Sequence, residues 1–134
     1  MTLTKNLLVL KKVTFSFAVG WTVLIAVLCL VKFTDLPSIG VSGADKYVHF
    51  TLHFVFTMLW GYHFWLKLNE IALPKIVVIV IISLCYGILI EILQEKFTTT
   101  RHADAFDVLA NFGGALLALV LFVLIKRRKQ QTTR

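Results

Sequence analysis

Apolar residues gather in four long runs that are separated by short polar stretches. The runs cover approximately residues 13–31, 47–66, 76–90 and 104–125. At about 1.5 Å per residue, the first run reaches about 28 Å as a helix, close to the ~30 Å hydrocarbon core of a bilayer. The third reaches that length only if its helix continues through Glu91 and Gln94. The pattern predicts an all-α fold, a membrane-spanning bundle of four transmembrane helices whose short connections make neighbours antiparallel.

Composition supports lipid as the solvent of this chain. It has 134 residues, suited to one domain, and 58% of them are hydrophobic, whereas soluble domains have about 45–50% apolar residues. The net charge of +7 comes from chain ends and short loops, so we expect contact with membrane lipids and no nucleic-acid partner. Cys29 and Cys85 lie inside apolar runs and are interpreted as buried packing residues.

Lysine and arginine are distributed unevenly between the two ends of the predicted helices. The N-terminal segment, the second connection and the C-terminal segment carry 10 of them, and the other side carries four. Basic residues favour the cytoplasmic side, so both termini are predicted to be cytoplasmic. We divide the chain into a basic cytoplasmic N-terminus (1–12), one transmembrane domain (13–125) and a basic cytoplasmic tail (126–134). The first run is long for a signal peptide, so we interpret it as a retained span.

Polar residues recur at helical spacing at one end of three runs. They are Asp45, His49 and His53 on the second, Glu91, Gln94 and Glu95 on the third, and Asp104, Asp107 and Asn111 on the fourth. Spacings of three, four and seven place each set on one helix face. Antiparallel order brings the three faces to one depth, near the outer leaflet. We therefore predict that they face one another around a shared pocket, with Gly87 and Gly114 allowing close helix approach.

Several of these residues have simpler explanations. Asp45 and Asp104 are suited to helix N-termini, where acids are favoured by about 0.3–1 kcal/mol. Asn111 is suited to hydrogen bonding between helices. Lys46 and Arg101 are suited to reaching lipid headgroups. Each alternative stays open from the sequence alone.

Glu91 and His49 are harder to explain as structural residues. Glu91 lies at the C-terminal end of its helix, where the helix dipole disfavours an acid, and near the membrane boundary, where charge costs free energy. It needs a cation or a proton, and His49, Lys46 and Arg101 are available partners. His53 lies about 6 Å deeper, where we expect a hydrogen-bonded histidine inside the bundle.

Three segments together resemble one family. "DKYVHF", "GILIEILQ" and "RHADAFDVLANFGG" look like the VanZ-like family of small bacterial multi-pass membrane proteins, over roughly residues 30–120. The matching positions are Asp45, Lys46, His49 and Phe50, then Gly87, Glu91 and Gln94, then Arg101, Asp104, Asp107, Asn111 and Gly114. His53 departs from the pattern, where an aromatic residue is usual, and so does the "TTT" before Arg101.

The resemblance implies a role in the cell envelope. The family is named after a protein linked to resistance against a glycopeptide antibiotic. Since its members are multi-pass membrane proteins, the resemblance also implies a location in the bacterial cytoplasmic (inner) membrane. It supplies no reaction, so whether this chain is an enzyme stays open and no cofactor is assigned.

The first functional hypothesis is a site that binds a lipid-linked or anionic envelope headgroup at the outer leaflet, with its chemical transformation left open. Helix N-termini attract anions, and Arg and Lys donate to phosphate. The candidate catalytic residues are His49, Glu91 and Asp107. The candidate substrate-binding residues are Asp45, Lys46, Gln94, Arg101, Asp104 and Asn111.

Three alternatives remain. His49, Glu91 and Asp107 are legitimate metal ligands, but no H-E-x-x-H or other dense ligand motif is present, so the sequence assigns no metal. The polar residues are also compatible with a structural latch in a non-catalytic subunit that assembles with a membrane-protein partner. Transport is less favoured, because the polar groups crowd one end of the spans.

Overall fold

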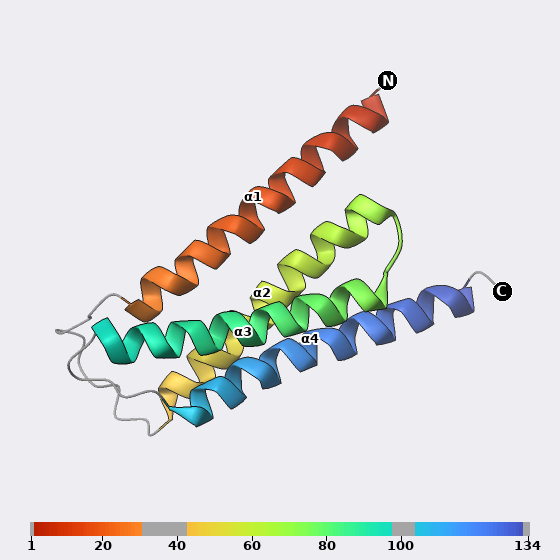
Figure 1. Ribbon diagram of the computed structural model, residues 1–134. Coiled ribbons are helices and arrows are strands. Elements are labelled where there is room, and N and C mark those ends of the chain that lie inside the picture. The colour runs from red at the N-terminus through yellow and green to blue at the C-terminus, as the bar shows by residue number, and fades with distance from the viewer. Residues whose placement is uncertain (1, 31–42, 98–103, 133–134) are drawn as a thin grey trace.

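Four long helices make up the structure. The computed structural model describes residues 2–30, 43–97 and 104–132, and its helices are α1 (Thr2–Leu30), α2 (Ala44–Leu68), α3 (Leu73–Phe97) and α4 (Ala105–Thr132). Arg101 lies outside the described residues. Both termini lie at one end of the molecule, and the starts of α2 and α4 lie with the end of α3 at the other (Figure 1). The prediction of an all-α protein is therefore confirmed.

The helices extend beyond the predicted spans. α1 continues through the basic N-terminal segment and α4 through most of the basic tail, because lysine, leucine and glutamine favour helix and no glycine or proline interrupts either stretch. α3 continues through Glu91 and Gln94, as its span length required. α2 ends at Leu68 and is followed by the C-cap residue Asn69, which adopts a left-handed conformation (φ 57°), and Pro74 lies in the first turn of α3, where proline is tolerated.

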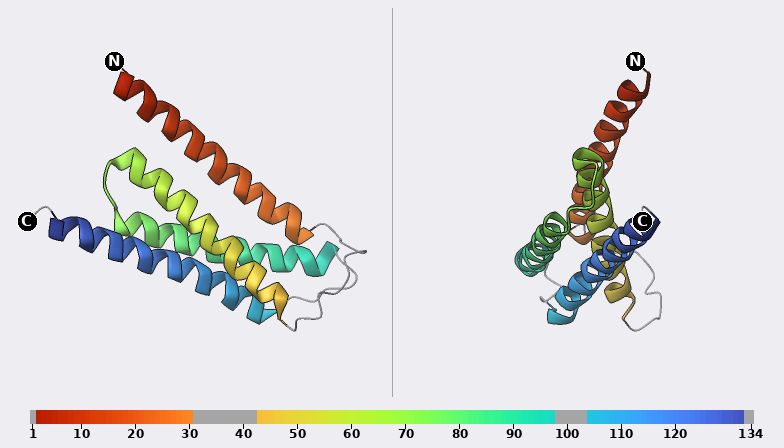
Figure 2. Two further views of the ribbon diagram at one scale, coloured as in Figure 1. Left: turned by 180° about the vertical axis from the view of Figure 1, so that it is seen from behind. Right: turned by 90° about the vertical axis from the view of Figure 1, so that its right-hand side faces the viewer.

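The arrangement differs from a compact four-helix bundle. α2, α3 and α4 pack on one another, whereas α1 contacts α2 and α3 only, among the described residues. The N-terminal half of α1 diverges from the other helices (Figures 1 and 2). Its apolar side chains there, including Leu8 and Val9, are exposed. The periodicity of a helix does not reveal how many neighbours cover it, so this divergence was not predictable from the sequence.

Close contacts at glycine hold α2, α3 and α4 together. A Cβ atom at Gly114 would collide with the backbone carbonyl oxygen of Phe50, and one at Gly87 would lie 2.6 Å from Nδ2 of Asn111. A Cβ at Gly61 would similarly overlap the ring of Phe122. Small residues thus allow the helices to approach closely, as predicted for Gly87 and Gly114. The apolar core around Phe122 includes Phe56 and Ile76.

The outside of the molecule is apolar. Three helical segments are long and apolar enough to cross a membrane, namely Lys5–Leu30, Leu73–Phe97 and Ala105–Thr132. Large hydrophobic side chains are exposed on α1, α3 and α4, whereas His49, His53 and Asn111 are buried. This distribution is the reverse of a soluble protein and indicates a membrane protein. Cys29 is buried as predicted, but Cys85 is exposed, so its interpretation as buried packing was wrong.

Candidate functional site

Polar side chains from α2, α3 and α4 meet where α2 and α4 begin and α3 ends. We call this set the polar cluster. It consists of Lys46 and His49 from α2, Glu91 from α3, Asp104 immediately before α4, and Asp107 and Asn111 from α4. His49, Glu91, Asp107 and Asn111 are buried. These four residues are therefore internal to the helix group, whereas Lys46 and Asp104 are partly exposed at its end.

His49 is the centre of the polar cluster. Its Nδ1 lies 3.2 Å from Oδ1 of Asn111, so a proton on Nδ1 is donated to the amide oxygen. Its Nε2 lies 3.8 Å from Oε1 of Glu91 and 3.8 Å from Oδ2 of Asp107. Both distances exceed hydrogen-bond length. The lone pair of Nε2 then faces two carboxylates, so three electron-rich groups converge on one point.

Glu91 is only partly satisfied. Its Oε2 accepts a hydrogen bond of 3.2 Å from the backbone N–H of Asp104. Its Oε1 is buried and has no hydrogen-bond partner within the described part of the chain, and the same holds for Oδ1 of Asp107. Buried polar atoms are satisfied in the large majority of cases, so two carboxylate oxygens without hydrogen bonds in one cluster, of which only that of Asp107 has an ion-pair contact with Lys46, are unusual and suit a ligand.

Lys46 contacts acidic residues at the starts of α2 and α4. Its ammonium donates to Oδ2 of Asp104 at 3.0 Å, and it lies 3.4 Å from Oδ1 of Asp107 and 3.6 Å from Oδ2 of Asp45. The distance to Asp107 is that of an ion pair without a hydrogen bond. Lys46 is therefore mainly the partner of Asp104, and the pair ties the first turn of α2 to the start of α4.

Asp104 also caps α4. Its Oδ1 accepts a hydrogen bond of 2.8 Å from the backbone N–H of Phe106, as expected at a helix N-terminus. This hydrogen bond and the neighbouring ammonium of Lys46 hold the pKa of Asp104 below its usual value. The capping explanation is thus confirmed for Asp104. Asp45 differs, because α2 has no side-chain cap hydrogen bond at its N-terminus.

The lowered pKa of Asp104 predicts a pH dependence. A carboxyl whose pKa falls on folding stabilises the folded state above its unfolded pKa, about 3.9, and loses that contribution as pH falls through the lowered value. Asn at position 104 keeps the cap but removes the charge. The melting temperature of the wild-type protein in detergent should exceed that of Asp104→Asn at neutral pH, and the difference should shrink below about pH 3.9. A difference that stays constant through this range contradicts the ionic role of Asp104.

A family model settles the relationship of this chain to known proteins. The model described as VanZ/LLP1 matches residues 4–126. The chain belongs to the VanZ/LLP1 family. The match covers all four helices and the polar cluster, so it confirms the resemblance seen in the three sequence segments. No solved structure matches the chain.

One protein similar to this chain comes from a eukaryote. An uncharacterized protein of the yeast Schizosaccharomyces pombe is 31% identical over 98 residues, which is 73% of this chain and 58% of that protein. The chain thus spans less than two thirds of the relative's length. Because this relative is eukaryotic, the bacterial inner membrane stays a prediction for this chain.

The VanZ/LLP1 pattern residues do not all lie in the polar cluster. Asp45 is exposed and contacts the polar cluster through Lys46, at 3.6 Å. Gln94 is buried one turn beyond Glu91, and its Nε2 donates to the backbone carbonyl oxygen of Cys29 at 2.7 Å, which ties α3 to α1. Arg101 cannot be placed, since it lies outside the described residues. The binding roles predicted for these residues stay predictions.

A second polar contact lies deeper in the VanZ/LLP1 helix group. His53 is buried, and its Nδ1 lies 2.8 Å from Oγ of Ser83, so the expected hydrogen-bonded histidine is confirmed. Thr57 continues the same face of α2, and its buried Oγ1 lacks a hydrogen-bond partner among the residues that the structure describes. Sequence analysis did not single out Thr57, although its spacing of four from His53 places it on that face.

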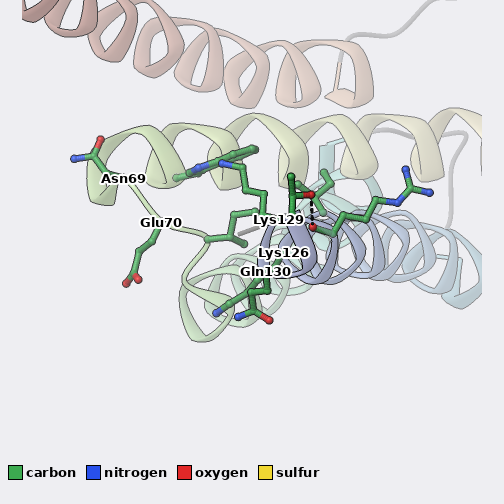
Figure 3. Close-up of a pocket in the computed structure, with 10 residues that line it drawn as sticks. Asn69, Glu70, Lys126, Lys129 and Gln130 are labelled. Atoms are coloured by element: carbon green, nitrogen blue, oxygen red, sulfur yellow. Dashed lines mark hydrogen bonds between the residues drawn. The ribbon is translucent and has the colours of Figure 1, made fainter. Parts of the chain in front are cut away.

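A basic groove lies at the opposite end of the molecule. It has a volume of about 680 Å³ and is lined by residues that include Trp65, Glu70 and Arg128. Figure 3 shows Lys126 and Lys129 on the last turns of α4, near the connection between α2 and α3. The ammonium of Lys129 lies 4.3 Å from the ring centroid of Trp65. This end therefore combines basic and aromatic side chains, as is typical of a membrane–water interface.

Proposed function

We propose that all four helices span the membrane, with both termini cytoplasmic and the polar cluster at the outer leaflet. α2 has 25 residues, which reach about 37 Å and suffice to cross the hydrocarbon core. Its low hydropathy comes from Asp45, Lys46 and three histidines, of which His49 and His53 are buried away from lipid. The excess of lysine and arginine at the end with both termini supports this orientation.

We propose further that the chain is a cell-envelope protein whose polar cluster binds the anionic, phosphate-bearing headgroup of a lipid or lipid-linked precursor. The observation that carries this proposal is the convergence of buried His49, Glu91 and Asp107, whose carboxylate oxygens Oε1 of Glu91 and Oδ1 of Asp107 lack hydrogen-bond partners among the residues that the structure describes. The N-termini of α2 and α4 lie beside them, and helix N-termini attract anions. Lys46 adds a charged hydrogen-bond donor on the partly exposed side of the polar cluster.

His49 is the residue best placed for proton transfer to or from a bound headgroup. Asn111 holds one ring nitrogen, and the other faces Glu91 and Asp107. This is the geometry of an oriented general acid or base. In this arrangement Asn111 orients the ring, and the two carboxylates hold positive charge at the point where phosphate would bind.

Removal of Lys46 tests headgroup binding. Lys46→Met should lower the affinity for short-chain phosphatidic acid about tenfold, the effect of losing one charge-assisted hydrogen bond. Titration of the detergent-solubilised protein, followed by native mass spectrometry, measures the affinity, with short-chain phosphatidylcholine as the comparison lipid. Lys96→Met is the matched control, because Lys96 is an exposed lysine at the end of α3, which lies at the same end of the molecule as Lys46. Equal effects of the two substitutions, or no preference for phosphatidic acid, would contradict the proposal.

A non-catalytic role as a subunit of an envelope complex is the second candidate. The observation that favours it is the set of contacts by which Asp104 joins α2 to α3, through Lys46 and Glu91. On this hypothesis the polar cluster is a latch that stabilises the protein for assembly with a partner. The two candidates predict opposite effects of substitutions at Glu91 on stability.

A further inference from the structure

The polar cluster carries more negative than positive charge. Glu91, Asp104 and Asp107 are its carboxylates, and Lys46, its lysine, makes its shortest contact with partly exposed Asp104 rather than with the buried acids. A phosphate that approaches Glu91 and Asp107 would add negative charge to a site that already has an excess. Binding of an anion at this place therefore requires a cation in addition to those that the described residues supply.

Three donor atoms are arranged to hold such a cation. One ligand atom each from His49, Glu91 and Asp107 lies within 4.8 Å of the others, and all three residues are buried. The imidazole Nε2 is 3.8 Å from each carboxylate. Donors that share a tetrahedral ion at ~2.1 Å lie roughly 3.4 Å apart, so binding an ion shortens each histidine–carboxylate distance by about 0.4 Å and brings the two carboxylates to the same spacing from within 4.8 Å. The separation is too long for hydrogen bonds between these groups and is suited to an ion between them.

Neighbouring groups orient these donors as they do at metal centres. A metal-binding histidine usually donates its second ring N–H to a carbonyl or carboxylate oxygen, and Nδ1 of His49 lies 3.2 Å from Oδ1 of Asn111. Oε2 of Glu91 accepts from the backbone N–H of Asp104, which leaves Oε1 without a hydrogen-bond partner among the described residues. These hydrogen bonds therefore engage Nδ1 of His49 and Oε2 of Glu91, and they leave Nε2 of His49 and Oε1 of Glu91 to face an ion.

We propose that His49, Glu91 and Asp107 bind a divalent transition-metal cation, with Zn²⁺ the best fit. One imidazole nitrogen and two carboxylate oxygens match the ligand types of zinc, and three protein ligands leave a fourth position open. Mg²⁺ and Ca²⁺ prefer oxygen ligands alone. The open position is the place where a phosphate oxygen binds, and this part of the inference rests on the proposed function.

Direct metal titration tests the site. The 134-residue chain, purified without a histidine tag and treated with EDTA, should bind one Zn²⁺ per chain by isothermal titration calorimetry in detergent, and Mg²⁺ much more weakly. Glu91→Gln and Asp107→Asn should each weaken Zn²⁺ binding at least about 100-fold, beyond the 10–100-fold typical of an outer-shell residue. Glu95→Gln, an exposed acid one turn further along α3, should leave it unchanged. Circular dichroism establishes that each variant is folded.

Wild-type measurements decide the inference even if a variant fails to fold. Less than one Zn²⁺ per five chains, or equal affinity in folded Glu91→Gln and Glu95→Gln, overturns the metal site. A protein that takes up no Zn²⁺ and whose phosphatidic-acid binding is unchanged by EDTA also overturns the metal site. That result leaves the proposed headgroup function intact. Stoichiometric Zn²⁺ binding without any phosphatidic-acid binding supports the metal site and removes the proposed headgroup function.

Discussion

The Glu91→Gln variant is expected to unfold at the same temperature as the wild-type protein or higher, and to bind phosphatidic acid at least about tenfold more weakly. Glutamine has nearly the same shape and still accepts a hydrogen bond from the backbone N–H of Asp104, which Glu91 accepts now. It removes a buried negative charge that faces Asp107 across His49. Replacing buried charge by a neutral group of similar volume is often neutral or stabilising, by roughly 1–4 kcal/mol.

Phosphatidic-acid binding by Glu91→Gln should weaken, although the stability of the variant is kept or raised. Glu91 helps to hold the positive charge to which phosphate is attracted, and glutamine holds it less well. Thermal unfolding in detergent with EDTA measures the first effect, because a bound cation would itself stabilise the wild-type protein. Native mass spectrometry with phosphatidic acid, without EDTA, measures the second. Glu95→Gln provides the control, since Glu95 is exposed, and should change neither. The latch hypothesis predicts a loss of roughly 1–3 kcal/mol of stability from the same Glu91→Gln change.

The Gly114→Ala variant is expected to be the most destabilised single-methyl substitution in the α2–α4 contact. A Cβ atom there would overlap the carbonyl oxygen of Phe50 and lie 3.0 Å from the backbone nitrogen of Phe54. Backbone atoms cannot rotate away as a side chain can, so α2 and α4 must separate. Overpacking typically costs about 1–3 kcal/mol, and we expect the upper part of that range. The melting temperature in detergent is the measurement.

Gly113→Ala is the matched control for Gly114→Ala. A Cβ atom at Gly113 would meet only the ring of Phe50, at 3.4 and 3.5 Å, which is close to ordinary van der Waals distance. Alanine also favours helix over glycine by up to about 1 kcal/mol. Gly113→Ala should therefore be neutral or stabilising. Equal losses at both positions would contradict the close approach of α2 and α4 on which the geometry of the polar cluster depends.

The sequence predicted the helices and the shared depth of their polar ends. Spacings of three and four placed Glu91, Asp107 and Asn111 on inward faces, because a helix turns through 3.6 residues whatever surrounds it. Short connections made neighbouring helices antiparallel, and this brought the polar ends together. The continuation of α3 through Glu91 and Gln94 also followed, since only a longer helix reaches across a bilayer.

Helical periodicity gives the direction of a side chain only approximately and its partner not at all, and the remaining differences have these two causes. Gln94 shares the face of Glu91, yet it binds a carbonyl oxygen of α1. Glu95 and Cys85 lie on exposed sides of α3. The three possible metal ligands come from three separate helices, so the sequence named them as possible ligands but offered no local ligand spacing from which to assign a metal.

The central claim, that the polar cluster is a ligand site rather than a structural latch, is tested most directly by measuring phosphatidic-acid affinity and melting temperature on one preparation of Glu91→Gln. The predicted result is weak binding together with an unchanged or higher melting temperature. Wild-type affinity together with a lower melting temperature would contradict the claim and assign the polar cluster to stability.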